Sequence, residues 1–272
     1  MPELPEVEVI ARGLDRTLTG RSVITAEVPG LTRLSESAET LVPKVLGRTV
    51  VRVFRRAKVL LIEMDDSSIL AFHLKMTGRV VHGLGRPVHR HDRILFLLDD
   101  GTQLSFSDMR KFGYVRSFTP QELAAWEFLA KAGPEPLETL PEVLADRIKG
   151  RNTAIKGLLL NQSVVVGVGN IYADESLFRA GIHPETKGAR IGQAGAVRLF
   201  TELQAVLRQA ISENGSSISD YVNSHGDAGA FQNSFNVYGR KGQECRACGS
   251  LLQAVKVAGR TSTFCPKCQP KR

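Results

Sequence analysis

Residues 59–74 read Val59-Leu60-Leu61-Ile62-Glu63-Met64, then Asp65-Asp66-Ser67-Ser68, then Ile69-Leu70-Ala71-Phe72-His73-Leu74. Two short runs rich in Val, Ile and Leu flank four polar residues, and this pattern predicts a β-hairpin. A second hairpin is predicted where Asp99-Asp100-Gly101 separates Arg93–Leu98 from Thr102–Phe106. Further strands are predicted at Ser22–Val28, Thr49–Arg55 and Arg79–His82. Short strands at this spacing predict an antiparallel β-sandwich.

Helical patterns lie on both sides of these strands. A helix is predicted over about residues 5–18, because Val7, Ile10, Ala11, Leu14 and Leu18 recur at helical spacing. From about Gln121 the apolar period is helical again, with Gly133-Pro134-Glu135-Pro136 as a predicted linker. Further helices are predicted near Glu142–Ile148, Ile155–Leu160, Ile171–Ala180 and Gln193–Asn214, followed by a mobile loop over Asp220–Ser234.

Composition and charge narrow the class of protein. The 272 residues are enough for two domains, and no apolar run approaches the length of a membrane span. The acidic N-terminus lacks the basic-then-apolar pattern of a signal peptide, so a cytoplasmic protein is expected. Of the net charge of +8, the segment from Arg240 to Arg272 carries +7. A basic end of this kind favours a nucleic-acid partner.

The last segment contains a four-cysteine motif. Cys245 and Cys248 form one Cys-x2-Cys pair, and Cys265 and Cys268 form a second pair after a 16-residue spacer. This spacing predicts one zinc ion bound by all four cysteines. Four thiolates complete a tetrahedral site and leave no ligand position open, so the role of the metal is expected to be structural. Binding the metal would supply on the order of 10 kcal/mol of folding energy. The alternating residues between the pairs predict a hairpin with Gly259-Arg260 at or near its tip.

The first residues, Met1-Pro2-Glu3-Leu4-Pro5-Glu6-Val7-Glu8, combine a helix start with a possible nucleophile. Loss of Met1 would leave the secondary amine of Pro2 beside carboxylates. An α-amino group titrates near ~8 and a lysine near ~10.4, so the terminal amine is the better nucleophile at neutral pH. The same residues also fit an ordinary helix N-terminus, with proline and glutamates in the first turn. The two interpretations are compatible.

Several motifs occur in the order seen in one enzyme family. They are the terminal Pro-Glu-Leu-Pro-Glu-Val-Glu, Phe72-His73-Leu74-Lys75-Met76-Thr77-Gly78, Asp108-Met109-Arg110-Lys111-Phe112-Gly113, Val166-Gly167-Val168-Gly169-Asn170-Ile171-Tyr172-Ala173-Asp174-Glu175, Val237-Tyr238-Gly239-Arg240-Lys241-Gly242 and the cysteine motif. Together they resemble the formamidopyrimidine-DNA glycosylases over almost the whole chain.

The resemblance implies an α+β multidomain fold. Its expected parts are an N-terminal catalytic β-sandwich with a leading helix (1–132), a linker (133–136), a helix–two-turn–helix segment with a lesion-capping loop near 220–234 (137–234), and a zinc finger with a β-hairpin (235–272). It also implies a monomeric enzyme that excises oxidised purines such as 8-oxoguanine from double-stranded DNA and cuts the strand at the abasic site. No membrane partner is expected.

The resemblance also implies roles for individual residues. Pro2 would attack C1′ of the damaged nucleotide and form a Schiff base, and Glu3 would donate a proton for sugar ring opening. Glu6 would help hold the polar network of the site. Lys58 would be the proton donor for β-elimination, and Arg260 would serve δ-elimination while gripping the DNA backbone. From the residue pattern alone, Lys58 is equally well a surface lysine at a strand-to-strand turn.

A second set of residues would contact DNA. Met76, Arg110 and Phe112 resemble the group that fills the space left by a flipped base, with Phe112 as a wedge and Arg110 donating to the orphaned cytosine. Without the resemblance, Met76 and Phe112 would be assigned to the core. Asn170 at a helix start suits a phosphate contact or a plain helix cap. Further positions that match DNA-contacting residues of the family are His91, Arg151 and Lys156.

Two residues depart from the pattern of the family. Thr77 stands at a variable position near the expected lesion pocket, and His225 stands where an acidic residue is expected in the capping loop, so closure of that loop could depend on pH.

Two alternative functions are left open by the sequence. An endonuclease VIII-like relative would act on oxidised pyrimidines, although Leu4 and the Met76, Arg110 and Phe112 group favour the purine enzyme. A noncatalytic DNA-binding protein is the other alternative, and the Pro2, Glu3 and Lys58 set argues against it.

Overall fold

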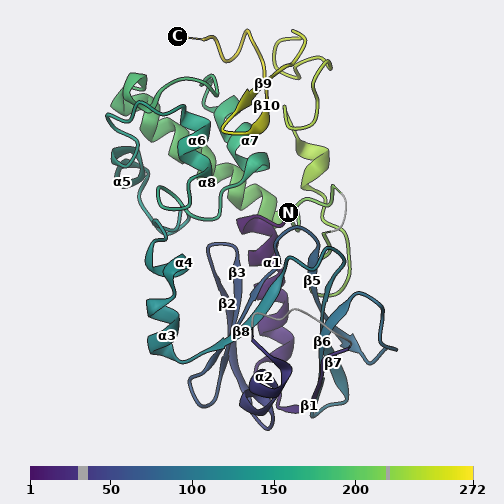
Figure 1. Ribbon diagram of the computed structural model, residues 1–272. Coiled ribbons are helices and arrows are strands. Elements are labelled where there is room, and N and C mark those ends of the chain that lie inside the picture. Colours follow the sequence, from purple (N-terminus) through teal and green to yellow (C-terminus); the bar gives the residue numbers. More distant parts are fainter. Residues whose placement is uncertain (30–35, 219–220, 272) are drawn as a thin grey trace. The chain divides into compact units, whose positions relative to one another are not determined.

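The computed structural model describes residues 1–29, 36–218 and 221–271, and the chain forms two compact units (Figure 1). The first unit comprises Met1–Ala130 and Glu213–Ala230, and the second comprises Lys131–Ser212 and Phe231–Arg272. The segment 213–230, expected as part of the helical segment, therefore packs with the first unit. Positions 219–220 of the loop region, including the predicted loop start at Asp220, and Arg272 of the basic end lie outside the described residues.

The first unit contains two four-stranded antiparallel sheets, as the hairpin patterns predict. One sheet has the order β1 (Val23–Glu27), β6 (Asp92–Leu98), β7 (Thr102–Asp108) and β5 (Gly78–Leu84). The other has the order β2 (Val50–Arg56), β3 (Val59–Met64), β4 (Ile69–His73) and β8 (Tyr114–Phe118). Both predicted hairpins are confirmed, with Glu63 opposite Ile69 and Leu97 opposite Gln103.

Helix α1 (Leu4–Leu18) packs against both sheets, contacting β2 and β3 of one and β5 of the other (Figure 1). Its buried residues include Val7, Ile10, Leu14 and Leu18, and they share one hydrophobic cluster with the facing strands. Apolar residues at this spacing form a continuous stripe along a helix. The helix therefore forms the centre of the core of this unit.

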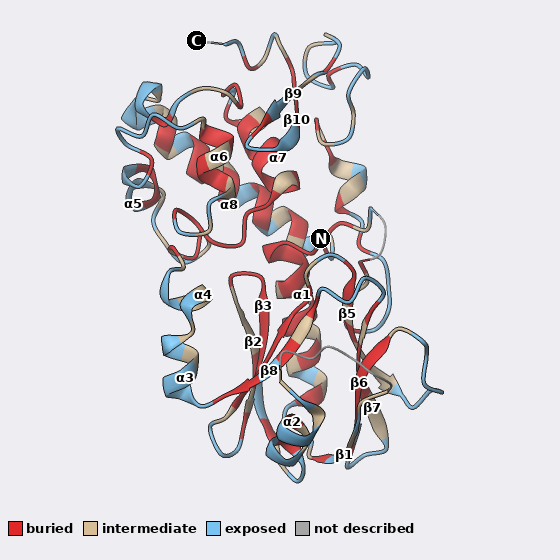
Figure 2. Ribbon diagram, in the orientation of Figure 1, coloured by how far each residue is buried: buried red, intermediate tan, exposed pale blue. Residues whose placement is uncertain are grey.

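The sheet β2-β3-β4-β8 is also covered on its outer face. Val59, Leu61 and Phe118 form a second hydrophobic cluster with Trp126 and Phe128. Trp126 directly follows the short helix α3 (Pro120–Ala125), and Phe128 lies in the short helix α4 (Glu127–Ala130). Successive residues of a strand point to opposite faces. Burial on both faces explains why β3 and β4 are almost continuously apolar, and Figure 2 shows β3 buried along most of its length.

The second unit packs helices around α7 (Asn170–Arg179) and α8 (Gln193–Ser212). Residues 171–177 of α7 are all buried (Figure 2). The remaining elements are α5 (Pro141–Asp146), α6 (Ile155–Leu160), the 3-10 helices Gly188–Arg190 and Phe231–Ser234, and the hairpin β9 (Gln253–Val257) and β10 (Arg260–Phe264). The predicted helices are confirmed to within a few residues at their ends. Among the described residues, none of the helices combines the length and the apolar composition that a membrane span requires.

Some short elements of the first unit have no clear signal in the sequence. Helix α2 (Ala38–Val45) contains Pro43, which removes a backbone donor and would argue against a helix. It forms because Ser37 caps its first turn, accepting a hydrogen bond from the Thr40 N–H, and because Leu41 and Val45 are buried. Strand β8 and helices α3 and α4 follow the Asp108–Gly113 motif, where only the overall onset of helical periodicity was expected.

The turn between β4 and β5 gives the first prediction. An added Cβ at Gly78 would lie 2.5 Å from the backbone oxygen of Leu74, whereas a Cβ at Gly83 on the same strand meets nothing within 4 Å. We expect Gly78→Ala to lower the free energy of unfolding of this unit by about 1–3 kcal/mol. Gly83→Ala is the matched control, with a change below about 1 kcal/mol. Urea unfolding followed by the fluorescence of Trp126, the only tryptophan of the chain, measures both. Equal effects of the two substitutions would contradict the steric argument.

Candidate active site and nucleic-acid interface

The start of α1 is a buried polar site. Met1 is 47% exposed, whereas Pro2 is buried, as are Glu3 at the cap of the helix and Glu6 in its first turn. The backbone N–H of Glu3 donates to the Glu6 carboxylate at 2.8 Å. The positive end of the helix dipole disfavours the protonated form of a free Pro2 amine, whereas the neighbouring Glu3 carboxylate favours it. The structure thus brings Pro2, Glu3 and Glu6 together.

Glu6 also holds the segment 213–230 against α1. Its second carboxylate oxygen accepts the Ser216 N–H at 2.9 Å, and the Tyr221 hydroxyl donates to the Glu6 carbonyl oxygen at 3.4 Å. Burial, with the nearby Glu6 carboxylate, raises the pKa of Tyr221 well above its usual value, so the hydroxyl stays protonated. One buried carboxylate therefore fixes both the start of α1 and the segment 213–230, which we call the returning segment.

Further along, the returning segment lies against the middle of α1. An added Cβ on Gly13 would lie 2.0 Å from the Ser224 hydroxyl, and the Ser224 carbonyl accepts the His82 N–H of β5 at 2.9 Å. His225 itself is exposed, and its N–H donates to the Asn223 side chain at 2.9 Å. The proposed pH dependence of this loop stays a prediction.

Lys58 lies in the two-residue connection between β2 and β3, where Arg56 pairs with Val59. It is buried, unlike a surface lysine, and the preceding Ala57 has a φ of 55°, which residues with a side chain rarely adopt. Burial, together with the charges of Lys75 and Lys58, lowers the pKa of His73 to about 3. The imidazole is therefore neutral at working pH, and its Nδ1 accepts the Lys75 N–H at 3.2 Å.

The loop that follows β7 presents Arg110 and Phe112 to solvent. Buried Asp108 at its base accepts the Gly113 N–H at 2.7 Å, the Arg110 N–H at 3.2 Å and the Thr77 hydroxyl. Phe112 is 56% exposed, and the Arg110 guanidinium lies over its ring. A large apolar side chain held out on a fixed loop is typical of a wedge residue rather than a core residue.

The same face of the first unit carries a groove of about 570 Å³. Its lining includes Thr77, Arg79, His91, Met109 and Val222, the last from the returning segment. Met76 is 38% exposed and lies next to Thr77 in the turn. The structure thus brings His91 and Thr77 into one hollow with the segment expected to cap a lesion.

In the second unit, Lys156 lies in the interior of the protein and not at the surface, where a DNA-contacting lysine is expected. Its side chain is completely buried, and its ammonium group donates to Asp174 at 2.7 Å and to the Thr261 carbonyl at 3.0 Å. Burial raises the pKa of Asp174, although Lys156 acts in the opposite direction. Asp174 also accepts the Ser262 hydroxyl at 2.6 Å and the Thr263 N–H at 3.0 Å. Within this structure the pair holds β10 against α6 and α7.

Asn170 lies at the start of α7 beside the same strand. Its amide donates to the Thr261 carbonyl at 3.2 Å, and its Oδ1 is buried without a hydrogen-bond partner among the described residues. Unsatisfied buried groups of this kind are rare and occur at functional positions. Arg260, the first residue of β10, is exposed at the hairpin turn, and Arg151 is exposed while bonding the Arg147 carbonyl at 2.8 Å.

A second buried carboxylate, Glu175, anchors the chain that leads into the cysteine segment. It accepts the N–H groups of Asn236, Val237 and Tyr238, each at 2.9 Å. A carboxylate that collects several backbone donors fixes a loop that has no secondary structure of its own. Residues 236–238 are thereby attached to α7.

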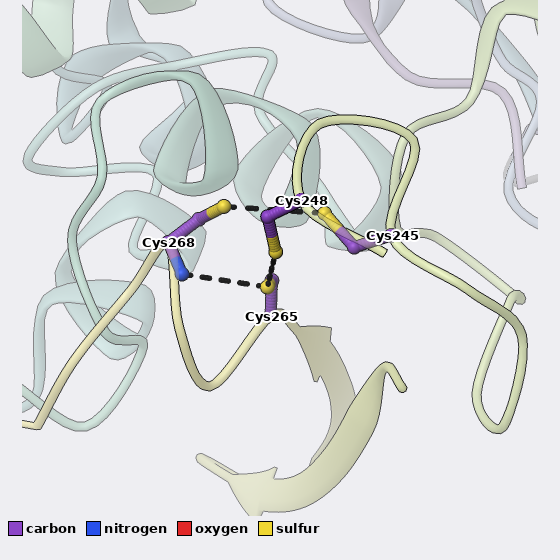
Figure 3. Close-up of side chains that lie close together, drawn as sticks. All are labelled: Cys245, Cys248, Cys265 and Cys268. Atoms are coloured by element: carbon purple, nitrogen blue, oxygen red, sulfur yellow. Dashed lines mark hydrogen bonds between the residues drawn. The ribbon is translucent and has the colours of Figure 1, made fainter. Parts of the chain in front are cut away.

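The four cysteines fit a tetrahedral zinc site (Figure 3). Their sulfur atoms all lie within 4.8 Å of one another, with Cys245 and Cys268 separated by 4.0 Å and Cys248 and Cys265 by 3.4 Å. Zn–S bonds of about 2.3 Å give edges of about 3.8 Å, which these two distances bracket. All four ligand positions are filled by cysteine, so the metal is structural.

Backbone strain is concentrated near the predicted site residues. Six described residues other than glycine have a positive φ, and four of them lie within two positions of a predicted site residue. These four are Ala57 before Lys58, Lys75 before Met76, Lys111 between Arg110 and Phe112, and Ala258 before Arg260. Strained conformations cluster at functional sites. This signal exists only in three dimensions.

The sequence did not single out the acidic residues that position these loops. Asp108, Asp174 and Glu175 stand in the sequence only as members of longer motifs, and Arg55 only as the last residue of a predicted strand. A buried aspartate has no local signature, because an exposed aspartate in a turn looks the same in sequence. The motif positions were the one available hint.

Comparisons with known proteins cover the same regions. Models described as "Formamidopyrimidine-DNA glycosylase N-terminal domain", "Formamidopyrimidine-DNA glycosylase H2TH domain" and "Zinc finger found in FPG and IleRS" match residues 1–115, 132–222 and 242–271. The formamidopyrimidine-DNA glycosylase of Bacillus subtilis is 39% identical over 277 residues, which cover both chains completely. That of Nitratidesulfovibrio vulgaris is 56% identical over 208 residues, 75% of this chain and 57% of the relative. This chain thus spans only part of the longer relative.

Solved structures give the same result. A Lactococcus lactis FPG mutant in complex with Fapy-dG containing DNA matches with a TM-score of 0.92 at 34% identity, over 99% of this chain and 100% of the other. The Lactococcus lactis protein in complex with DNA containing an abasic site matches with a TM-score of 0.91 at the same identity and coverage. MutM in complex with carbocyclic 8-oxo-G containing DNA matches with a TM-score of 0.91 at 33% identity.

The zinc site gives the second prediction. Removing zinc with a chelator should unfold residues 240–271, because metal binding contributes on the order of 10 kcal/mol to the folding of such a segment. Limited proteolysis should then cut within this segment, and adding zinc should restore protection. Unfolding of the first unit, followed by Trp126 fluorescence, is the control and should not change. A segment that stays resistant after complete zinc removal would contradict the prediction.

The buried ion pair gives the third prediction. Asp174→Asn leaves the Lys156 charge buried without a counter-charge and should destabilise the second unit by about 3–5 kcal/mol. Glu185→Gln removes one partner of the exposed Lys271–Glu185 pair and should cost less than about 1 kcal/mol. Thermal unfolding of each variant, followed by circular dichroism of the helices, measures the difference. Similar losses in both variants would show that burial of the pair has no energetic consequence.

Proposed function

Because the chain belongs to the formamidopyrimidine-DNA glycosylase family, it is a DNA glycosylase for oxidised purines with the AP lyase activity of that family, and we propose which residues perform each step. The observation that carries the assignment is the buried start of α1, which holds Pro2 beside the carboxylates of Glu3 and Glu6. An amine next to a helix N-terminus and to proton-transfer groups suits nucleophilic catalysis.

In the proposed reaction, the lone pair of the free Pro2 nitrogen attacks C1′, the base leaves with the electron pair of the glycosidic bond, and the departing base takes up the proton that the Pro2 amine loses. Glu3 donates a proton for sugar ring opening, which leaves an iminium between Pro2 and C1′. This cation withdraws electrons from C2′, so that loss of a C2′ proton expels the 3′ phosphate in β-elimination. Lys58 supplies the proton in that step. The second elimination expels the 5′ phosphate, and Arg260 stabilises the leaving oxygen.

DNA binding is proposed to use residues of both units. Met76, Arg110 and Phe112 fill the stack after the damaged base is flipped, and the fixed base of the 108–113 loop supports this role. His91, Asn170 and Arg151 contact the backbone. Lys156, which is buried, acts through its contact with β10 rather than from the surface. We further propose that the first unit is catalytic, with the loop near 220–234 covering the lesion.

The proposed place of action is the bacterial cytoplasm, where chromosomal DNA is the substrate. The relatives named above are bacterial proteins with the same domain models.

Borohydride trapping gives the fourth prediction. Protein with a free Pro2 should form a covalent adduct with duplex DNA containing 8-oxoguanine or an abasic site, because borohydride reduces the Schiff base. An uncleaved N-terminal extension should abolish the adduct and leave DNA affinity within about threefold. The same extension at the C-terminus is the control. Full trapping by the N-terminally extended protein would contradict the role of Pro2.

The trapping experiment also separates the alternative functions. In an excision assay with the same protein, thymine glycol should be removed from duplex DNA more slowly than 8-oxoguanine placed opposite cytosine. The opposite order would favour a pyrimidine-specific enzyme of the endonuclease VIII type. Absence of an adduct with the free N-terminus would favour a noncatalytic DNA-binding protein.

A further inference from the structure

We propose that Glu8 and Arg55 are positioning residues that fix the Lys58 turn relative to the start of α1. The proposal rests on the role of Lys58 proposed above. Neither residue belongs to the set assigned to chemistry or to DNA binding. The supporting observation is a chain of hydrogen bonds that runs from α1 through Arg55 to the residue before Lys58.

The first link joins the helix to the sheet. The Glu8 carboxylate accepts Arg55 Nε at 2.7 Å through one oxygen and Arg12 Nε at 2.7 Å through the other. The Arg55 side chain is 4% exposed, whereas that of Arg12 is 58% exposed. Screening by water weakens the pair on the surface far more than the buried one. Glu8 therefore holds the buried arginine firmly and the exposed one weakly.

The second link joins Arg55 to the turn. Arg55 Nη1 donates to the Ala57 carbonyl at 3.3 Å, while Nε is bound to Glu8. A guanidinium group can make both contacts at once because its donors are held in a rigid plane. Lysine, with one ammonium group on a flexible chain, cannot reproduce this geometry. The contact thus depends on arginine in particular.

The turn needs such support because it is strained. Ala57 has a φ of 55° and is completely buried, and a residue with a Cβ is disfavoured in this region. The hydrogen bond from Arg55 holds the Ala57 carbonyl in the strained arrangement. On the other side, Val59 is fixed by pairing with Arg56 and with His73. The backbone of Lys58 is therefore held from both neighbours.

The consequence for catalysis is geometric. Glu8 lies five residues after Glu3, which is about 7.5 Å along the axis of a helix. The arginine thereby connects the lysine turn to the helix that carries Pro2 and Glu3, so that the amine and the ammonium group are set on one rigid frame. Displacement of a reacting group by about 1 Å can slow a reaction about a hundredfold.

The test measures strand cleavage in a single turnover, with saturating enzyme and duplex DNA that contains a preformed abasic site. Arg55→Ala should slow cleavage at least tenfold, and Arg55→Lys at least fivefold. Arg12→Ala, which removes the other partner of Glu8 without touching the turn, is the matched control and should stay within twofold. Borohydride trapping and thermal unfolding of the same variants check that the Schiff base forms and the fold persists. Arg55→Lys keeps the charge and provides the readout if Arg55→Ala does not fold.

A double-mutant cycle separates positioning from general stabilisation. If Arg55 acts through Lys58, then Arg55→Ala should change cleavage less than twofold in a Lys58→Gln background, because the group it positions is already gone. Independent, multiplicative slowing would overturn the proposal. Normal cleavage by both Arg55 variants, with Lys58→Gln impaired, would overturn the positioning role alone. Normal cleavage by Lys58→Gln would overturn the proposed role of Lys58 and the positioning role with it.

Discussion

Burial of α1 between the two sheets is the constraint on which the first unit depends. Because the buried residues of α1 begin in its first turn, the N-terminus of the helix is buried as well, where the first N–H groups have no partner within the helix. Glu6 resolves this problem by accepting the Glu3 N–H and the distant Ser216 N–H through its two oxygens. The hydrogen bonds that complete the helix therefore also hold the segment 213–230. The Pro2 nitrogen, which lies at this helix start, is therefore held in a fixed position before DNA binds.

A similar arrangement occurs at two other loops that carry predicted site residues. Asp108 holds the loop that carries Arg110 and Phe112, and Asp174 holds the strand that begins with Arg260. In each case a buried carboxylate collects donors at the base of the loop, while the side chains at its tip stay exposed. Ionised acceptors form stronger hydrogen bonds than neutral ones, and stronger still away from water. The result is a rigid base with a tip that is free to meet a ligand.

The elements that could be predicted from sequence are those governed by short-range patterns. The hairpins at 65–68 and 99–101, helix α1 and the four-cysteine motif each depend on residues within a few positions of one another. Helix α2 was missed because Pro43 gives a signal against a helix, and burial of Leu41 and Val45 outweighs it. Burial of Lys156 has no signal in the sequence because lysine is usually exposed, and its partner Asp174, 18 residues away, makes burial possible.

The sequence by itself determined the class and order of the elements, the zinc ligands, and the motifs that mark Pro2, Glu3 and Lys58. The tertiary structure alone decided which carboxylates are buried, that 213–230 returns to the first unit, and that Ala57 is held in a left-handed conformation beside Lys58. The physical reason is range. Periodicity and turn propensity act over a few residues, whereas burial and hydrogen bonds such as that from Ser216 to Glu6 join positions 210 residues apart.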